Sequence, residues 1–135
     1  MEESEIKKLI NMARNERLLA YSPYSGFSVG AALLCKNGEV ICGCNIENAS
    51  YGATNCAERT AVFKAISDGI KDFLAIAVVG GKSGEEPEDY AYPCGMCRQV
   101  LSEFCSSDFN VIVAKNTDDY KVYKLSELLP EAFKL

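Results

Sequence analysis

The spacing of apolar residues changes several times along the chain, and these changes predict a mixed α/β protein. The first segment has the spacing of one helical face, with acidic residues before it, where the helix dipole favours negative charge. The apolar residues of this face are Ile6, Leu9, Ile10 and Ala13. The pair Ser22-Pro23 ends this helix, because the residue before a proline avoids helical backbone angles.

A β-hairpin is predicted after the first helix. Alternate residues are apolar over 27–35, the Asn37-Gly38 pair is a strong signal for a tight turn, and the alternation resumes over 40–44. A loop rich in Asn, Ser and Gly is expected to occupy residues 45–55.

The remaining pattern predicts alternating helices and strands. Helix formers over 56–67 precede Gly69, which suits a helix C-terminus, and the apolar run 73–79 indicates a strand covered on both faces. We then expect a mobile loop over 80–92, a helix over 93–105, strands over 111–113 and 120–125, and a short helix from Ser126 that Pro130 interrupts. Five strands with intervening helices indicate one mixed sheet with helices on both faces, in a single domain over residues 1–135.

Composition excludes several classes of function. The chain has no histidine, which rules out a Ser-His-Asp triad, a Cys-His pair and any histidine-ligated metal. Its 14 basic and 19 acidic residues give a net charge of −5, so we expect no nucleic-acid partner. No apolar run is long enough to span a bilayer, and the N-terminus does not resemble a secretory signal, so we expect no membrane association and a cytoplasmic location.

The seven cysteines supply the candidate chemistry, because cysteines in a reducing compartment are often metal ligands or catalytic groups. Cys56 and Cys94 each stand at the predicted start of a helix, where free N–H groups and the helix dipole stabilise a thiolate. Cys97 is three residues beyond Cys94, which places both sulfurs on one helical face. The remaining cysteines are expected to be small core residues without a metal: Cys35, Cys42, Cys44 and Cys105.

Three thiolates make three of the four ligands of a tetrahedral zinc site, and an open fourth position is typical of a catalytic zinc. Glu58 follows the first candidate ligand by two residues, and a carboxylate beside a metal-held water can transfer its proton to a substrate. Arg59 is suited to offset the negative charge of three thiolates on one divalent ion.

Two other interpretations of the cysteines remain open from the residues alone. The Cys94-x-x-Cys97 pair has the spacing of a redox motif, although that motif normally follows the first strand of a βαβ unit. A purely structural zinc would take its fourth ligand from one of the other cysteines, and the chain would then be an interaction module without catalysis.

The two cysteine segments resemble the zinc-dependent nucleoside and base deaminases, whose signature has a three-cysteine variant. The motifs are Cys56-Ala57-Glu58-Arg59 and Pro93-Cys94-Gly95-Met96-Cys97-Arg98-Gln99. Residues 22–33, 45–51 and 128–133 extend the resemblance over nearly the whole chain and narrow it to the small homotetrameric cytidine deaminases. The family fold implied is a three-layer α/β/α arrangement with a mixed five-stranded sheet.

The resemblance implies an activity and a role for each site residue. The activity would be hydrolytic deamination of cytidine and 2′-deoxycytidine in pyrimidine salvage, in a homotetramer with shared active sites. One Zn²⁺ per chain would be held by Cys56, Cys94 and Cys97, with Glu58 as the proton carrier and Arg59 in support. Substrate contacts would come from Phe27, Asn45, Glu47, the Ala57 backbone and the Phe133 of a neighbouring subunit, with Tyr24 and Tyr51 at the pocket or the subunit contact.

Some features leave the substrate open. Gly26, Ser28 and Tyr92 depart from the residues usual in such enzymes, and Tyr92 is expected to change the pocket wall. The same chemistry on a cytosine-bearing antibiotic such as blasticidin S is an alternative. Editing of RNA or DNA is disfavoured by the negative charge and the short chain.

Overall fold

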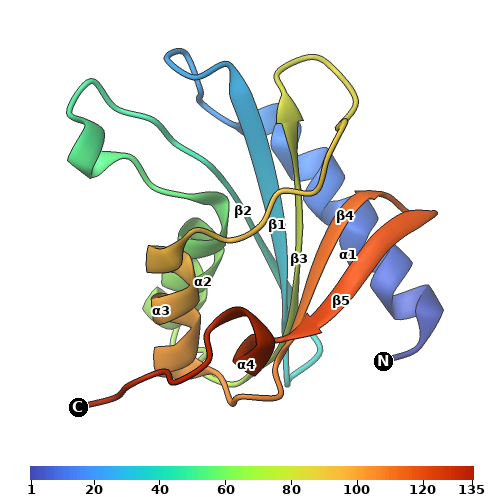
Figure 1. Ribbon diagram of the computed structural model, residues 1–135, viewed down its shortest axis with the longest axis vertical. Coiled ribbons are helices and arrows are strands. Elements are labelled where there is room, and N and C mark those ends of the chain that lie inside the picture. The colour runs from blue at the N-terminus through green and yellow to red at the C-terminus, as the bar shows by residue number, and fades with distance from the viewer.

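The computed structural model describes residues 1–135 and contains one five-stranded sheet between helices (Figure 1). The elements in chain order are α1 (Glu3–Glu16), β1 (Phe27–Cys35), β2 (Val40–Cys44), α2 (Ala57–Ser67), β3 (Phe73–Lys82), α3 (Gly95–Phe104), β4 (Asn110–Asn116), β5 (Asp119–Lys124) and α4 (Leu125–Leu128). Short 3₁₀ turns cover Arg17–Leu19 and Tyr51–Ala53. No helix combines the length and the apolar character that crossing a membrane requires.

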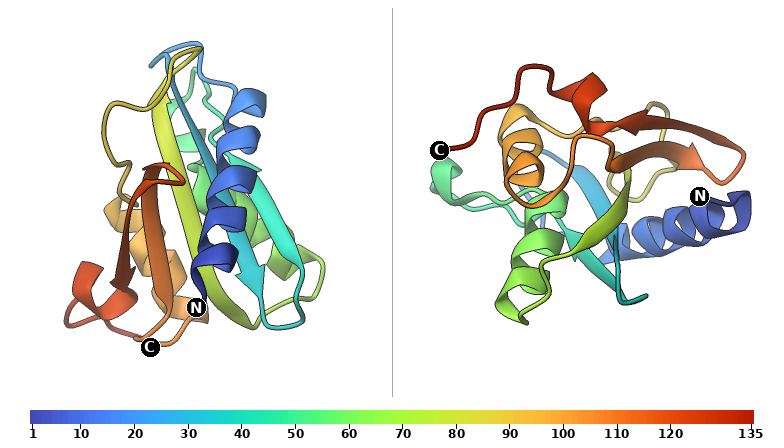
Figure 2. Two further views of the ribbon diagram at one scale, coloured as in Figure 1. Left: turned by 90° about the vertical axis from the view of Figure 1, so that its right-hand side faces the viewer. Right: turned by 90° about the horizontal axis from the view of Figure 1, so that it is seen from below.

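The strands lie in the order β2-β1-β3-β4-β5, and only the β3–β4 pair is parallel. Helix α1 covers one face of the sheet, and α2 and α3 cover the other (Figure 2). The expected three-layer α/β/α fold with a mixed sheet is therefore confirmed.

The central strands bury both of their faces, as their unbroken apolar sequence requires. In β3, Ile76 and Val78 pack in the core layer toward α2 and α3, whereas Ala75, Ala77 and Val79 pack in the layer toward α1. Each of these residues is at most 1% exposed. The sheet is thus a rigid platform on which the helices are fixed.

Two glycines let helices approach the sheet closely. A Cβ atom added at Gly30 would lie 1.9 Å from the carbonyl oxygen of Ala13 in α1. A Cβ atom at Gly43 in β2 would lie 2.6 Å from the carbonyl oxygen of Ala57 and 2.5 Å from the amide nitrogen of Ala61. Gly43 therefore sets the position of the first turn of α2, which carries Glu58.

Several expectations from the sequence were wrong in their limits, including that of β4, which spans Asn110–Asn116 and not only 111–113. The first helix ends at Glu16 and continues only as a 3₁₀ turn, before the Ser22-Pro23 pair. The segment 80–92 is not a loop throughout, because β3 extends to Lys82 and Gly80 pairs with Val29. The last helix begins at Leu125, one residue earlier than expected.

Candidate metal centre and active-site cavity

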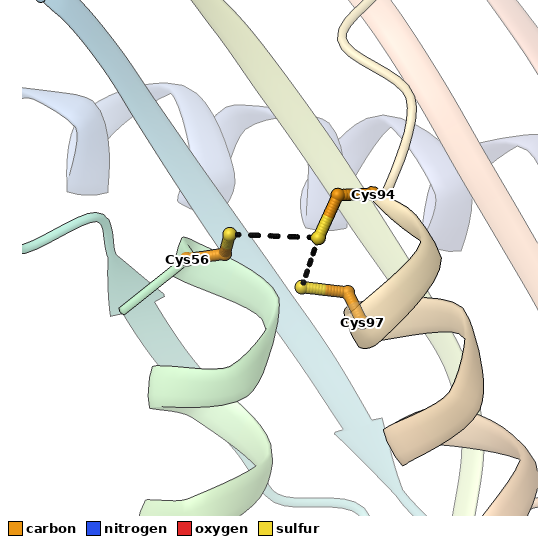
Figure 3. A group of neighbouring side chains, drawn as sticks. All are labelled: Cys56, Cys94 and Cys97. Carbon is orange, nitrogen blue, oxygen red and sulfur yellow. Dashed lines mark hydrogen bonds between the residues drawn. The ribbon is translucent and has the colours of Figure 1, made fainter. Parts of the chain in front are cut away.

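Three cysteine sulfurs meet where α2 and α3 begin (Figure 3). Cys56 and Cys94 are the residues immediately before the first turns of α2 and α3, and neither side chain caps its helix. The Cys94 sulfur lies 3.8 Å from that of Cys56 and 3.5 Å from that of Cys97. All three sulfurs lie within 4.8 Å of one another.

The topology explains why residues 38 positions apart come together. Helix α2 precedes β3 and helix α3 precedes β4, and β3 and β4 are parallel neighbours. Both helices cross the same face of the sheet before returning into these strands, so their N-termini lie at one end of the sheet (Figure 1). The three cysteines that the sequence singles out as candidate metal ligands therefore lie together.

Arg59 places a positive charge against the sulfurs. Its Nη2 atom donates a hydrogen bond to the Cys56 sulfur at 3.3 Å, and its Nε is buried without a partner. Hydrogen bonds from Cys97 and Arg59 lower the pKa of Cys56 to about 5, although burial opposes the shift. The hydrogen bond to Cys56, with burial, raises the pKa of Cys97.

The sulfur group fits a zinc ion. In a tetrahedral site with Zn–S bonds of about 2.3 Å, sulfurs lie about 3.8 Å apart, close to the two separations given above. Soft thiolate ligands next to a guanidinium are a suitable donor set for a divalent zinc ion.

The other four cysteines do not join this group, so the structural site with four cysteine ligands is not formed. Cys35, Cys44 and Cys105 are buried elsewhere, and Cys42 is partly exposed. The expectation that these cysteines are small packing residues is met for the three that are buried.

Glu58 lies in the first turn of α2, next to the sulfurs, with 4% of its surface exposed. Burial, reinforced by the negative charge of Cys56, raises the pKa of Glu58 to about 7. A carboxyl group of that acidity can both accept and donate a proton near neutral pH. No other acidic residue has this combination of burial and proximity to the sulfurs.

A cavity of about 440 Å³ opens onto the sulfurs and Glu58. Its lining includes four of the five residues that the sequence assigned to substrate contacts, together with the predicted proton carrier and two of the predicted metal ligands. The four are Phe27, Asn45, Glu47 and Ala57, and the other three are Glu58, Cys56 and Cys94. Cys97 is fully buried behind this lining. The residues from β1, the loop after β2 and the start of α2 therefore converge on one cavity.

Two polar residues of the cavity are held in place by the backbone near β1. The side-chain amide of Asn45 accepts a hydrogen bond from the Val29 amide and donates one to the Phe27 carbonyl, each at 2.8 Å. The Glu47 carboxylate accepts bonds from the Ser25 hydroxyl and from the Ser25 and Tyr24 amides. The Ser25 hydroxyl, with these amides, holds the pKa of Glu47 below its ordinary value, so it stays a carboxylate.

The remaining predicted residues lie outside this cavity. The rings of Tyr24 and Tyr51 pack edge to face, 6.3 Å apart, beside an adjoining depression that shares Glu47 and Thr54 with the cavity. Phe133 is 64% exposed near the C-terminus and does not line the cavity of its own chain.

Sequence reasoning missed several wall residues: Val29, Thr54, Asn55, Val78 and Ala91. Thr54 and Asn55 immediately precede Cys56, and this adjacency was the available signal. Tyr92, expected to alter the wall, does line the cavity. The contact of Ser25 with Glu47 was also missed, because nothing in the sequence indicated that these two residues are hydrogen-bonded.

Comparison with known proteins gives a consistent result. Residues 3–113 match the family model described as the cytidine and deoxycytidylate deaminase zinc-binding region. A cytidine deaminase of Halalkalibacterium halodurans is 54% identical over 125 residues, covering 93% of this chain and 91% of that protein. The crystal structure of cytidine deaminase from Burkholderia pseudomallei is similar with a TM-score of 0.84 and 47% identity, covering 93% of this chain and 97% of that one.

A relative with another name is also similar. A blasticidin-S deaminase of Bacillus cereus is 32% identical over 126 residues, covering 91% of this chain and 88% of that protein.

Proposed function

The chain belongs to the cytidine and deoxycytidylate deaminase family, and from that premise we propose that it hydrolyses cytidine and 2′-deoxycytidine to uridine and 2′-deoxyuridine with release of ammonia. The observation that carries the proposal is the position of Glu58, buried beside three thiols at a cavity that also reaches Asn45 and Glu47. The whole of residues 1–135 acts as one catalytic domain.

The three cysteines would hold the metal. When bound there, zinc supplies the Lewis acidity that activates water as the nucleophile of hydrolysis. Arg59 keeps the Cys56 sulfur in its thiolate form through the hydrogen bond from its Nη2 atom. The guanidinium also compensates the charge that the sulfurs bring to the site.

Glu58 carries the protons of the reaction. Its carboxylate accepts the proton lost by the attacking water and donates it to N3 of the cytosine ring. It then accepts the proton of the hydroxyl group now on C4 and donates it to the departing amine nitrogen, so that the C4–N bond breaks and ammonia leaves. The burial of this carboxyl group, at 4% exposure, keeps bulk water from competing for those protons.

The nucleoside is bound by groups around the cavity mouth. The Glu47 carboxylate accepts from ribose hydroxyls, and the lone pair and N–H that Asn45 does not use toward β1 are available to the same sugar. Phe27 packs on the base ring and the Ala57 backbone orients the base. Hydrogen bonds already hold the side chains of Asn45 and Glu47 before the sugar binds. Binding therefore costs little side-chain conformational entropy at these two residues.

A homotetramer with shared active sites is part of the proposal. Large apolar side chains remain exposed on the segments around the Tyr21–Ile46 bridge: Leu18, Leu19, Tyr21, Tyr24, Ile46 and Tyr51. An exposed apolar surface of this kind suits contact with another copy. The exposed Phe133 is free to reach a neighbouring subunit's cavity.

A cytoplasmic location and a role in pyrimidine salvage are also part of the proposal. All seven cysteines are free thiols, which suits the reducing environment of the cytoplasm.

The test replaces Glu58 without removing the metal ligands. Glu58→Gln should lower the rate of cytidine deamination at least about a hundredfold while zinc content and folding stay unchanged. Glu103→Gln is the matched control, because Glu103 is an exposed carboxylate of α3. Normal turnover by the Glu58→Gln protein, or no cytidine turnover by the unmodified zinc-loaded chain, would contradict the proposal. Blasticidin S assayed in parallel decides between the two substrates that the relatives' names suggest.

A further inference from the structure

Tyr92 lines the same cavity as Glu58. The cavity lining combines Cys56 and Glu58, at the start of α2, with Ala91, Tyr92 and Cys94, which lead into α3. Figure 3 shows the starts of α2 and α3 on opposite sides of the sulfur group, with the chain entering α3 beside Cys94. Tyr92 is 41% exposed and contributes to the lining of this cavity.

The Tyr92 side chain is held by an aromatic cluster. Its hydroxyl lies 3.1 Å from that of Tyr123 on β5, and the two rings pack edge to face at 5.8 Å. The Tyr90 ring packs against Tyr92 at 6.4 Å, while the ammonium groups of Lys115 and Lys121 lie 4.9 and 4.8 Å from the Tyr90 ring centre. The Tyr92 ring is thus held by packing against Tyr90 and Tyr123, and the two lysines hold Tyr90 in turn by cation–π attraction.

The chemistry of the base fixes which edge faces this wall. Carbon 4 of cytosine, where hydrolysis occurs, stands between N3 and C5 in the ring. If Glu58 delivers a proton to N3, then N3 faces α2 and C5 points to the opposite side of the cavity. C5 then lies toward the start of α3, and the segment before that helix contributes Ala91 and Tyr92 to the lining.

We propose, resting on the proposed function, that Tyr92, anchored by Tyr123, is a specificity-determining residue that limits the size of the substituent on C5 of the pyrimidine. Because the ring packs against both Tyr90 and Tyr123, turning aside to admit a larger group would break these contacts. The chain therefore prefers cytidine over cytidines with a methyl group or larger group at C5.

The test compares cytidine with 5-methylcytidine. Tyr92→Ala should raise the ratio of kcat/KM for 5-methylcytidine to that for cytidine about tenfold or more, the discrimination that a pocket achieves for one methyl group. Tyr92→Phe keeps the ring and should change the ratio by less than threefold. Equilibrium binding of 5-methyluridine and uridine to the zinc-loaded proteins gives a second readout, in which Tyr92→Ala should improve the relative affinity for 5-methyluridine.

A substitution outside the cavity tests whether the contact between Tyr123 and Tyr92 is needed for this specificity. Tyr123→Phe removes the hydroxyl that contacts Tyr92 and should shift the same ratio toward 5-methylcytidine. Tyr120→Phe is its matched control, because Tyr120 lies on the same strand but packs against the core layer toward α1, and it should leave the ratio unchanged. If Tyr92→Ala does not fold, Tyr123→Phe decides the question alone.

Unchanged ratios in both Tyr92→Ala and Tyr123→Phe, with normal cytidine turnover, would overturn the inference and leave the proposed function standing. Absence of cytidine turnover by the unmodified protein would overturn the proposed function and this inference with it.

Discussion

The Nη2 atom of Arg59 lies 3.3 Å from the sulfur of Cys56, three residues earlier in the chain. The guanidinium thus donates directly to a candidate metal ligand, and its remaining buried Nε has no partner in the protein. A residue so placed acts on the metal through its ligand, as partners of metal ligands generally do.

We expect Arg59→Ala to weaken zinc binding or reduce kcat/KM by about 10–100-fold, because the thiolate charge is no longer compensated. Zinc affinity is measured by competition with a chromophoric chelator, and turnover by loss of the cytosine absorbance. Arg14→Ala, a change of an arginine that pairs with Glu86 on the surface, is the control. Unchanged zinc affinity and kinetics in Arg59→Ala would show that the guanidinium has no such role.

Gly43 is expected to be intolerant of a side chain. Gly43→Ala should destabilise the protein by about 1–3 kcal/mol, because the new Cβ would clash with the backbone of Ala57 and Ala61 in α2. Gly52→Ala, where nothing lies within 4 Å of the added atom, should have a much smaller effect. Urea unfolding followed by circular dichroism measures both, and equal midpoints would contradict the close approach of α2 to β2.

Phe133 is expected to complete the cavity of a neighbouring subunit. Phe133→Ala should impair deamination with zinc content intact, since the residue is exposed and does not line the cavity of its own chain.

A mixing experiment separates this role from a structural one. Assemblies made by refolding Phe133→Ala together with Glu58→Gln contain sites in which an intact Glu58 meets an intact Phe133 from another chain. Activity of the mixture well above that of either variant alone is the expected result. Activity no higher than the sum of the two variants would rule out the shared site.

The sequence predicted the order of elements well because most of the signals were local. The Asn37-Gly38 turn and the apolar run at 73–79 both led to the observed strands. The end of β3 was missed because Gly80 was interpreted as a chain breaker. In the structure a Cβ at Gly80 would lie 2.8 Å from that of Ala91, so the glycine permits close packing within a strand.

For the candidate site, too, local signals were sufficient for some residues, whereas contacts between distant residues were missed. The spacing of Cys56, Cys94 and Cys97 and the adjacency of Glu58 were sufficient to predict the metal centre. Cys56 and Cys94 stand where helices begin, and the positive end of a helix dipole stabilises a thiolate there. The hydrogen bonds of Asn45 to the backbone of β1 were not predictable, since they join residues 16 and 18 positions apart. Such contacts depend on how the strands pack and have no local sequence signal.

The central claim is that three sulfurs, and no fourth, hold a zinc ion beside Glu58. X-ray absorption at the zinc edge, on purified protein whose cytidine turnover has been measured, tests it most directly. The account predicts one zinc per chain, with three sulfur neighbours at about 2.3 Å and one lighter atom. A fourth sulfur neighbour, or full activity in protein that contains no transition metal, would contradict it.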